Sequence, residues 1–246
     1  SVNIITLEDP VEYKMDGVNQ IQVNADVGLT FATGLRSILR LDPDIVMVGE
    51  IRDGETANLA VQAALTGHLV FSTLHTNSAA GILPRLIDMG IEPFLIASTV
   101  NTIIGQRLIR RVSPKRNVYQ STPLETESIM ETVGHLLPKT KEEVASVSAD
   151  LGYKDLPLAG QKSYTLVKGR DTPQTPGGYL GRAGIYEVMD VSDAVQQLII
   201  KRATASEVQK VAVAEGMVTM RQDGYLKALN GLTTIEEVNR VAADTA

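Results

Sequence analysis

The stretch LDPDIVMVGEIRDGETANLAVQAALTGHLVFSTLHT, residues 41–76, decides how this chain folds. Residues 44–50 form a short apolar, β-branched run that ends in Glu50. Such a run is typical of a strand buried on both faces of a parallel sheet, with the carboxylate emerging at the strand's carboxyl end. In open α/β sheets the ligand crevice lies outside those ends. Glu50 is thus placed to hold Mg²⁺ directly or through water, or to orient an attacking water.

A turn, a helix over residues 55–65 and a second buried strand over residues 68–75 follow at once. The second strand carries His68 at its start and His75 at its end. An acid at a strand end is often only a surface cap, and a lone histidine in a strand is often a satisfied polar group. We expect Glu50 and both histidines to converge on one edge of the sheet, which favours a reactive site.

A second group of acids lies near the start of the chain. Residues 1–6 begin abruptly in a strand-like run without an initiator Met, so we expect a fragment whose upstream part is missing. The run leads into Glu8, Asp9 and Glu12, around Pro10, which ends regular strand pairing. These acids form either a solvated turn or a carboxylate group beside a nucleotide's γ-phosphate, and the residues alone leave both interpretations open.

Further segments have simpler patterns. Residues 17–27 alternate like a strand, and residues 30–40 and 79–89 have apolar side chains at helical spacing. Residues 94–104 are mostly apolar, and we expect a long helix there that continues toward residues 106–111. The basic end of that helix suits the helix dipole.

The composition then changes, since six of the ten prolines fall in Pro114–Pro176. We expect helices over residues 124–137 and 141–151 and strands near residues 164–168 and 185–189. Three candidate capping boxes then start short helices that carry no evident chemistry: Thr204 with Glu207, Thr219 with Gln222, and Thr233 with Glu236.

The composition limits the classes of protein to which this chain can belong. With 246 residues, 43% of them hydrophobic, the chain can bury a sizeable core. A net charge of −6 gives no support for nucleic-acid binding, and no run approaches the roughly 18 apolar residues of a membrane span. Cysteine is absent, which rules out disulfides and thiolate metal sites and fits the cytoplasm.

Three blocks resemble one known family in the right order and at the right distances. LRLDPDIVMVGEIRD is similar to the Walker B block of the type II secretion and type IV pilus assembly ATPases, TGHLVFSTLHTN to their histidine box, and ITLEDPVEY to their Asp box. The segments GIEPFLIAS, QRLIRR and GRAGIYEVM extend the resemblance, and the carboxyl-terminal residues look like the assembly-type members rather than the retraction ATPases.

The resemblance implies an α/β fold with a RecA-like P-loop NTPase core, an insertion and a carboxyl-terminal helical subdomain. We expect the core over residues 1–112, the insertion over residues 113–182 and the helical subdomain over residues 183–246. The intact protein would hydrolyse ATP with Mg²⁺ and drive motion as a homohexamer. It would act in the cytoplasm on an inner-membrane platform protein of a pilus or secretion machine.

The resemblance also assigns candidate site residues. Glu50 would hold Mg²⁺ and its water, and Glu12 would polarise the nucleophile, with His75 as a third catalytic candidate. The nucleotide side would include four further residues: Glu8, Asp9, Arg52 and His68. Arg36 and Arg40 are ordinarily solvated, but in a ring they would reach a neighbour's phosphates.

Two features of the family are absent from this sequence. The two CxxC pairs that bind zinc are replaced around Ser113–Arg116 and Asp171–Thr175, so we expect an insertion without zinc. No GxxxxGK[ST] phosphate loop occurs either. The alternatives are therefore a truncated motor, a degenerate ring subunit without catalysis, or a related competence or conjugation ATPase.

Overall fold

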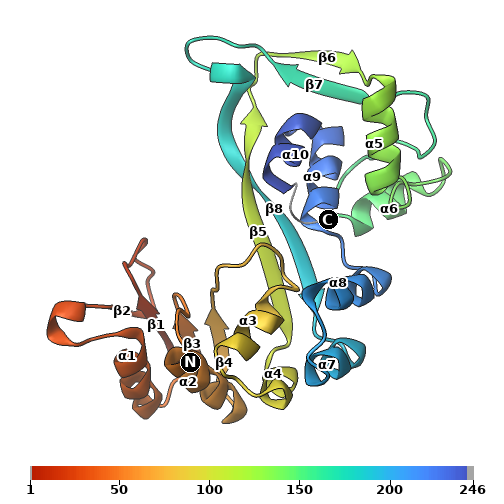
Figure 1. Cartoon of the computed structure of the whole chain (residues 1–246). Helices are drawn as coiled ribbons and strands as arrows, with labels where there is room; N and C mark the ends of the chain where they lie inside the picture. Colours follow the sequence, from red (N-terminus) through yellow and green to blue (C-terminus); the bar gives the residue numbers. More distant parts are fainter. Residues whose placement is uncertain (1, 243–246) are drawn as a thin grey trace. The chain divides into compact units, whose positions relative to one another are not determined.

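A computed structural model describes residues 2–242 (Figure 1). The chain divides into two compact units. The first comprises Ser1–Ile103 and Met189–Glu215, and the second comprises Ile104–Val188 and Gly216–Ala246. Within the described residues, no helix is both long enough and apolar enough to cross a membrane.

The first unit is built on a parallel sheet of four strands. Their order is β2 (Asn19–Gln22), β1 (Ile4–Glu8), β3 (Ile45–Val48) and β4 (Leu69–Ser72). All neighbouring pairs are parallel, so the four carboxyl ends lie along one edge of the sheet. The strand that leads to Glu50 thus has a parallel partner on each side. Its apolar run predicted a parallel strand buried on both faces, but Ile45 and Met47 are only partly buried.

One face of the sheet is covered by helices α1 (Phe31–Ile38) and α2 (Gly54–Leu65). Alternate strand residues point into this layer, and they are almost fully buried: Ile5, Leu7, Val46 and Val48. Leu7 packs closely against α1 at Gly34, where an added Cβ would lie 2.8 Å from the leucine methyls. This packing fixes β1 and β3 beneath the helices.

Strand β4 is not buried on both faces, so that expectation is wrong. Leu69 is 48% exposed and Phe71 is 53% exposed. Both belong to the face opposite α1 and α2, and β4 is the last strand of the sheet that the described residues form. A short apolar run looks the same whether one or both of its faces are covered, because periodicity alone does not distinguish the two.

Later segments complete the first unit. Helices α3 (Ile82–Asp88) and α4 (Pro93–Thr99) follow β4, and α7 (Asp193–Ile200) and α8 (Ala205–Ala214) return from much farther along the chain. Helix α7 packs on α4. The division by contacts thus assigns residues 193–214 to the unit that holds the sheet, whereas the sequence placed them in a separate helical subdomain.

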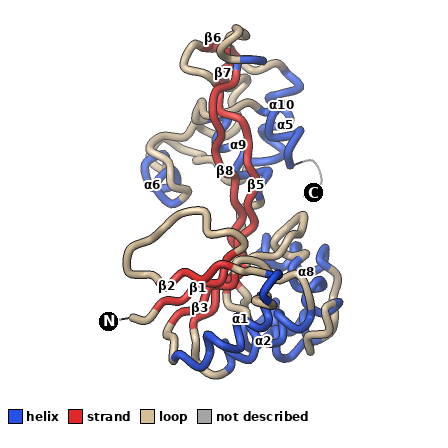
Figure 2. Tube along the Cα trace, turned by 90° about the vertical axis from the view of Figure 1, so that its left-hand side faces the viewer, coloured by secondary structure: helices blue, strands red, loops and turns tan. Residues whose placement is uncertain are grey.

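The expected long helix after residue 94 is also wrong. Helix α4 ends at Thr99, and β5 (Thr102–Val112) is a strand that pairs with β8 (Tyr179–Asp190); Figure 2 shows the two strands side by side. The backbone amide of Val191 donates to the carbonyl of Asn101 at 2.9 Å and begins the pairing.

The burial pattern of β5 explains this error. Ile103 and Ile109 are buried, while Ile104 and Leu108 are exposed, which is the two-residue period of a strand. β-branched residues and Gly105 also weaken a helix here. The pairing partner lies far along the chain, so the local apolar spacing was misleading.

The second unit joins the insertion to the carboxyl-terminal helices. Strands β6 (Arg116–Gln120) and β7 (Thr165–Gly169) are antiparallel, and α5 (Pro123–Val133) and α6 (Val144–Asp150) lie between them in sequence, close to the predicted segments. Short 3₁₀ helices also occur in the described residues, at Ala25–Val27, Leu39–Leu41 and Pro176–Gly178.

A single core holds the insertion to helices α9 (Met220–Leu229) and α10 (Ile235–Ala242). Ile129 and Val133 of α5 share this core with Tyr225 of α9, and all three are fully buried. The insertion is therefore not held by its own helices alone, because α5 packs directly on α9.

The capping boxes of α8 and α9 form as predicted, with Thr204 and Thr219 as the caps. The third predicted box, Thr233 with Glu236, is wrong, because the next residue, Thr234, caps α10. The hydroxyl of Thr234 accepts from the amide of Glu237 at 3.1 Å, while the hydroxyl of Thr233 donates to the carbonyl of Arg110 at 2.9 Å. A tertiary contact to β5 thus decides which threonine caps α10.

Candidate functional site

The candidate site begins where β3 ends. The amide of Gly49 donates to the carbonyl of Leu7 at 2.8 Å, so the chain after β3 stays against the end of β1. A Cβ at Gly49 would lie 3.1 Å from that carbonyl oxygen, so glycine permits the approach. The next residue, Glu50, therefore emerges at the carboxyl edge of the sheet, with 20% of its side chain exposed.

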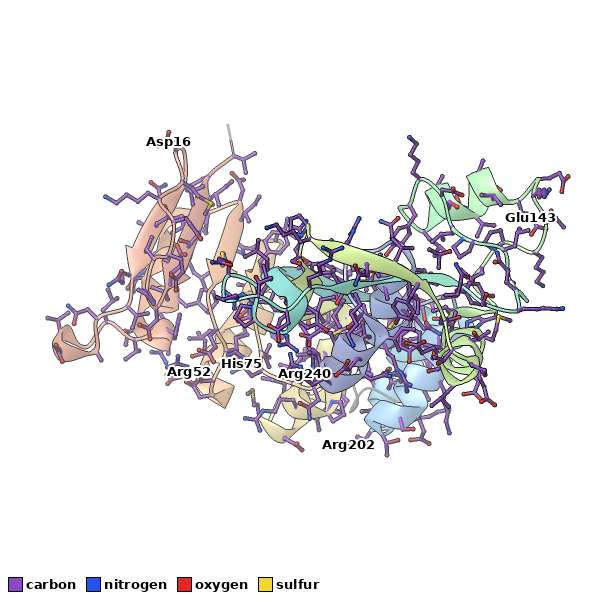
Figure 3. All side chains as sticks on the ribbon, turned by 90° about the horizontal axis from the view of Figure 1, so that it is seen from above. Asp16, Arg52, His75, Glu143, Arg202 and Arg240 are labelled. Atoms are coloured by element: carbon purple, nitrogen blue, oxygen red, sulfur yellow. The ribbon has the colours of Figure 1, made fainter. Side chains whose placement is uncertain are left out.

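Both carboxylate oxygens of Glu50 have a cationic or imidazole partner. His75 Nε2 lies 3.0 Å from Oε1, and Arg52 Nε donates to Oε2 at 2.6 Å. Arg52 Nη1 also lies 3.9 Å from Asp9 Oδ2 at the end of β1. Figure 3 shows Arg52 and His75 on the same side of the first unit. The structure thus brings Asp9, Glu50, Arg52 and His75 together.

This group contributes little to stability. The side chains of His75 and Arg52 are 86% and 60% exposed, and exposed ion pairs are worth about 0–1 kcal/mol. Packing also places few demands on such exposed side chains. Two carboxylates, a guanidinium and an imidazole at the edge of the sheet are instead accessible to a bound phosphate, metal ion or water.

The other acids near the start of the chain take different positions. Glu8 Oε2 accepts from Thr6 Oγ1 at 2.6 Å and from Gln20 Nε2 at 2.9 Å, which directs it along the sheet toward β2. Glu12 is exposed in the loop that follows β1. Because β1 and β3 are parallel, this loop starts at the same edge as Glu50.

His68 does not join the group, and its expected place at this edge is wrong. Its Nδ1 lies 2.9 Å from the carbonyl of Ala63 and 3.1 Å from the hydroxyl of Thr66. It precedes β4, so it lies at the amino edge of the parallel sheet, whereas His75 follows the strand. A strand advances roughly 3.3 Å per residue, so its two ends cannot serve one small site.

The two candidate inter-subunit arginines belong to the helix layer. Arg36 in α1 pairs with Glu55 in the first turn of α2. Arg40 is exposed in the 3₁₀ turn before β3. Their predicted contact with a neighbouring subunit stays a prediction.

Hydroxyl groups occupy the region where the sequence lacks the CxxC pairs. Ser113 Oγ donates to the carbonyl of Lys115 at 2.8 Å, and the hydroxyls of Thr172 and Thr175 lie 2.7 Å apart. Neutral hydroxyls are poor zinc ligands. These three groups have hydrogen-bond partners within the chain, and the prediction of an insertion without zinc remains a prediction.

The side chains at the sheet edge suit Mg²⁺ better than a metal ion that needs three or more protein ligands. Among residues 2–242 there is no group of three or more His, Cys, Asp or Glu side chains placed to hold a metal ion. Mg²⁺ commonly uses one or two carboxylates and takes its other ligands from phosphates and water. Glu50 and Asp9 supply such carboxylates. The sequence supplies no glycine-rich loop to hold the phosphates.

Two residues of the site were not singled out from the sequence. Ser72 Oγ donates to the carbonyl of Val48 at 2.7 Å, and Thr73 Oγ1 donates to the carbonyl of Gly49 at 2.6 Å. The available signal was a pair of hydroxyl residues near the end of the strand predicted over residues 68–75; in the structure they lie at the carboxyl end of β4.

Comparison with known proteins gives a consistent set of matches. The profile of a family described as "Type II/IV secretion system protein" matches residues 1–240. A type II secretion system protein E of Xanthomonas campestris is 46% identical over 244 residues, which cover 99% of this chain and 39% of that protein. The type IV pilus assembly ATPase PilB of Myxococcus xanthus is 43% identical over 236 residues, covering 96% of this chain and 38% of that protein.

Among solved structures, the pilus retraction motor PilT with bound ADP has a TM-score of 0.64 and 28% sequence identity. The match covers 99% of this chain and 53% of the PilT chain. The chain spans less than half the length of the secretion protein of Xanthomonas campestris and of the PilB of Myxococcus xanthus.

Proposed function

This chain belongs to the type II/IV secretion system protein family, and we propose that it carries the metal- and water-binding side of an ATP hydrolysis site. Its parallel sheet and helices have the RecA-like α/β fold predicted from the sequence, which is also the fold of PilT. The observation that carries the proposal is the convergence of Asp9, Glu50, Arg52 and His75 at the carboxyl edge of that sheet.

Each residue of the group has a role in this proposal. When bound, ATP with Mg²⁺ supplies a phosphoryl group whose charge the metal ion neutralises. Glu50 would hold the metal and its water, and His75 and Arg52 orient its carboxylate through one oxygen each. Asp9 anchors Arg52 from β1. Glu12 polarises the attacking water from the loop after β1.

The remaining parts of the proposal concern the intact protein. Phosphate binding requires a loop that these 246 residues do not contain, and we propose that the protein encoded by the complete gene supplies it. The size of the two relatives, of which the chain covers 39% and 38%, supports this view. The intact protein would form a homohexamer, peripherally attached to the cytoplasmic side of the inner membrane through a platform protein.

Type IV pilus assembly and type II secretion both fit the relatives' names. One relative described above is a type II secretion system protein E and the other a pilus assembly ATPase, at similar identities of 46% and 43%. The retraction motor PilT is less similar in sequence, at 28%. These values favour assembly or secretion over retraction.

The proposal is tested by Glu50→Gln in the protein encoded by the complete gene, with phosphate release as the assay. This substitution keeps the shape of the side chain and removes its charge. We expect kcat to fall by about 10²-fold or more while the protein stays folded. Glu92→Gln, an exposed change at the start of α4, is the matched control and should leave kcat unchanged. Near-normal hydrolysis by Glu50→Gln would remove Glu50 from this role.

A ring subunit without catalysis is the second candidate, and the missing phosphate loop favours it. The two are separated by the ATP affinity of these 246 residues alone and of the protein from the complete gene. We expect weak binding by the former and clear binding by the latter. Micromolar ATP affinity of the 246 residues would contradict the proposal that the phosphate-binding loop lies outside them. Failure of the longer protein to bind ATP would support the ring subunit without catalysis.

A further inference from the structure

Thr73 holds the backbone on both sides of Glu50. Its side-chain oxygen donates to the carbonyl of Gly49 at 2.6 Å, and its own carbonyl accepts from the amide of Ile51 at 2.9 Å. One residue of the chain after β4 therefore contacts the residues immediately before and after Glu50. We refer to these two hydrogen bonds as the Thr73 clamp.

The clamp lies beyond the point where the regular strand pairing ends. The last paired residues of β3 and β4 are Val48 and Ser72, so no ladder bond fixes the peptide between Gly49 and Glu50. Glycine has the widest choice of backbone angles, and its own preferences do not set the direction of Glu50. The hydroxyl of Thr73 supplies the missing constraint, because it fixes the direction of the carbonyl that precedes Glu50.

The same segment also reaches the side chain of Glu50. His75, two residues after Thr73, contacts Glu50 Oε1 at 3.0 Å. Backbone and side chain of Glu50 are thus both held by residues 73–75, while Arg52 holds the other carboxylate oxygen.

We propose that Thr73 is a positioning residue for Glu50 and sets the orientation in which that carboxylate meets Mg²⁺ and water. This inference rests on the proposed ATPase function. In this proposal Thr73 does not contact the nucleotide and acts only through the backbone next to Glu50. Displacement of a reacting group by about 1 Å can cost about 10²-fold in rate, so one lost hydroxyl has a measurable consequence.

A hydroxyl-to-carbonyl bond at a strand end also has a simpler role, which is to stabilise the fold. Thr73 is exposed, so its substitution by valine, which has nearly the same shape, removes the hydroxyl without opening a cavity in the core. A purely structural bond would affect stability and leave the turnover of the folded protein unchanged. A positioning bond would lower kcat and leave KM for ATP nearly unchanged.

The test compares Thr73→Val, Thr73→Ser and Thr99→Val in the protein encoded by the complete gene. Thr99 is a matched control because its hydroxyl donates to the carbonyl of Leu95, also at 2.6 Å, within α4. We expect Thr73→Val to lower kcat by at least tenfold with KM within twofold of its original value. Thr73→Ser, which keeps the hydroxyl, should restore kcat to within twofold, and Thr99→Val should match the unchanged protein.

Hydrogen exchange gives a second readout that does not depend on turnover. Loss of the hydroxyl bond should loosen the other half of the clamp, so exchange of the Ile51 amide should speed up at least tenfold in Thr73→Val, with no change in α2. A Thr73→Val protein that keeps kcat within twofold would overturn the inference, as would unchanged exchange at the Ile51 amide. If the unchanged protein hydrolyses no ATP, the proposed function fails, and hydrogen exchange alone then decides whether the clamp exists.

Discussion

Glu237 offers the sharpest test of how the second unit is held together. Its side chain is fully buried, yet it binds two arginines. Arg110 of β5 donates to it through the backbone amide at 3.0 Å, Nε at 3.0 Å and Nη2 at 2.7 Å. Arg240, one turn farther along α10, donates through Nε at 2.9 Å and Nη2 at 2.7 Å. Arg110 also lies over the ring of Tyr179, 4.2 Å from its centroid.

These contacts set the ionisation of Glu237. Burial by itself would raise the pKa of the carboxyl, but the hydrogen bonds from Arg240 and Arg110 lower the pKa from 4.5 to about 2. A difference of this size corresponds to about 3 kcal/mol of stability at neutral pH. Because the native pKa is the lower one, this stability is complete above about pH 5 and is lost as the pH falls toward 2.

The perturbation is Glu237→Gln, which keeps the shape and removes the charge. We expect the free energy of unfolding at pH 7 to fall by about 3 kcal/mol, since Arg110 and Arg240 lose their buried partner. Glu236→Gln changes an exposed neighbour and is the matched control. The assay is urea unfolding followed by circular dichroism at pH 7, 5, 4 and 3.

The pH dependence separates this explanation from a simple packing defect. The difference between the two variants should be less than half its pH 7 value by pH 3, because the unfolded carboxyl is then already protonated. A difference that stays constant from pH 7 to pH 3 would refute the electrostatic reasoning. Equal stability of the two variants at pH 7 would show that the buried carboxylate contributes no net stability.

Two further predictions concern packing and capping. Leu7→Ala should lower the free energy of unfolding by about 2–5 kcal/mol in urea denaturation, because Leu7 is fully buried against α1. A loss below about 1 kcal/mol would contradict the close packing of Leu7 against α1. Thr234→Ala should cost about 1 kcal/mol by removing the cap of α10, which thermal unfolding would detect as a lower Tm. An unchanged Tm would contradict the observed cap.

Local patterns in the sequence were sufficient for much of the first unit. The apolar run before Glu50 predicted a parallel strand, and the following helix begins at Gly54 because the Asp53 side chain accepts from the amide of Thr56 at 2.8 Å. The caps at Thr204 and Thr219 are equally local. In each case the residues that decide the structure lie close to one another along the chain.

The candidate site was only partly predictable. Asp9, Glu50 and His75 could be placed because parallel strands bring their carboxyl ends to one edge. The predicted strand over residues 68–75 already separates His68 from His75 and carries it to the other edge, so the expected convergence of both histidines was wrong. The role of Thr73 was not predictable from local patterns, because its partners, Gly49 and Ile51, lie far from it along the chain.

The amino-acid sequence alone was enough to set the order of strands and helices around Glu50 and the acids that follow β1, because strand burial, helix caps and turns depend on near neighbours. Long-range contacts were needed to establish that residues 102–112 form a strand, that residues 193–200 pack on α4, and that Thr233 binds the carbonyl of Arg110 rather than capping α10. Each of these depends on a partner distant in sequence. Its free energy comes from burial and pairing that exist only after the chain has closed on itself.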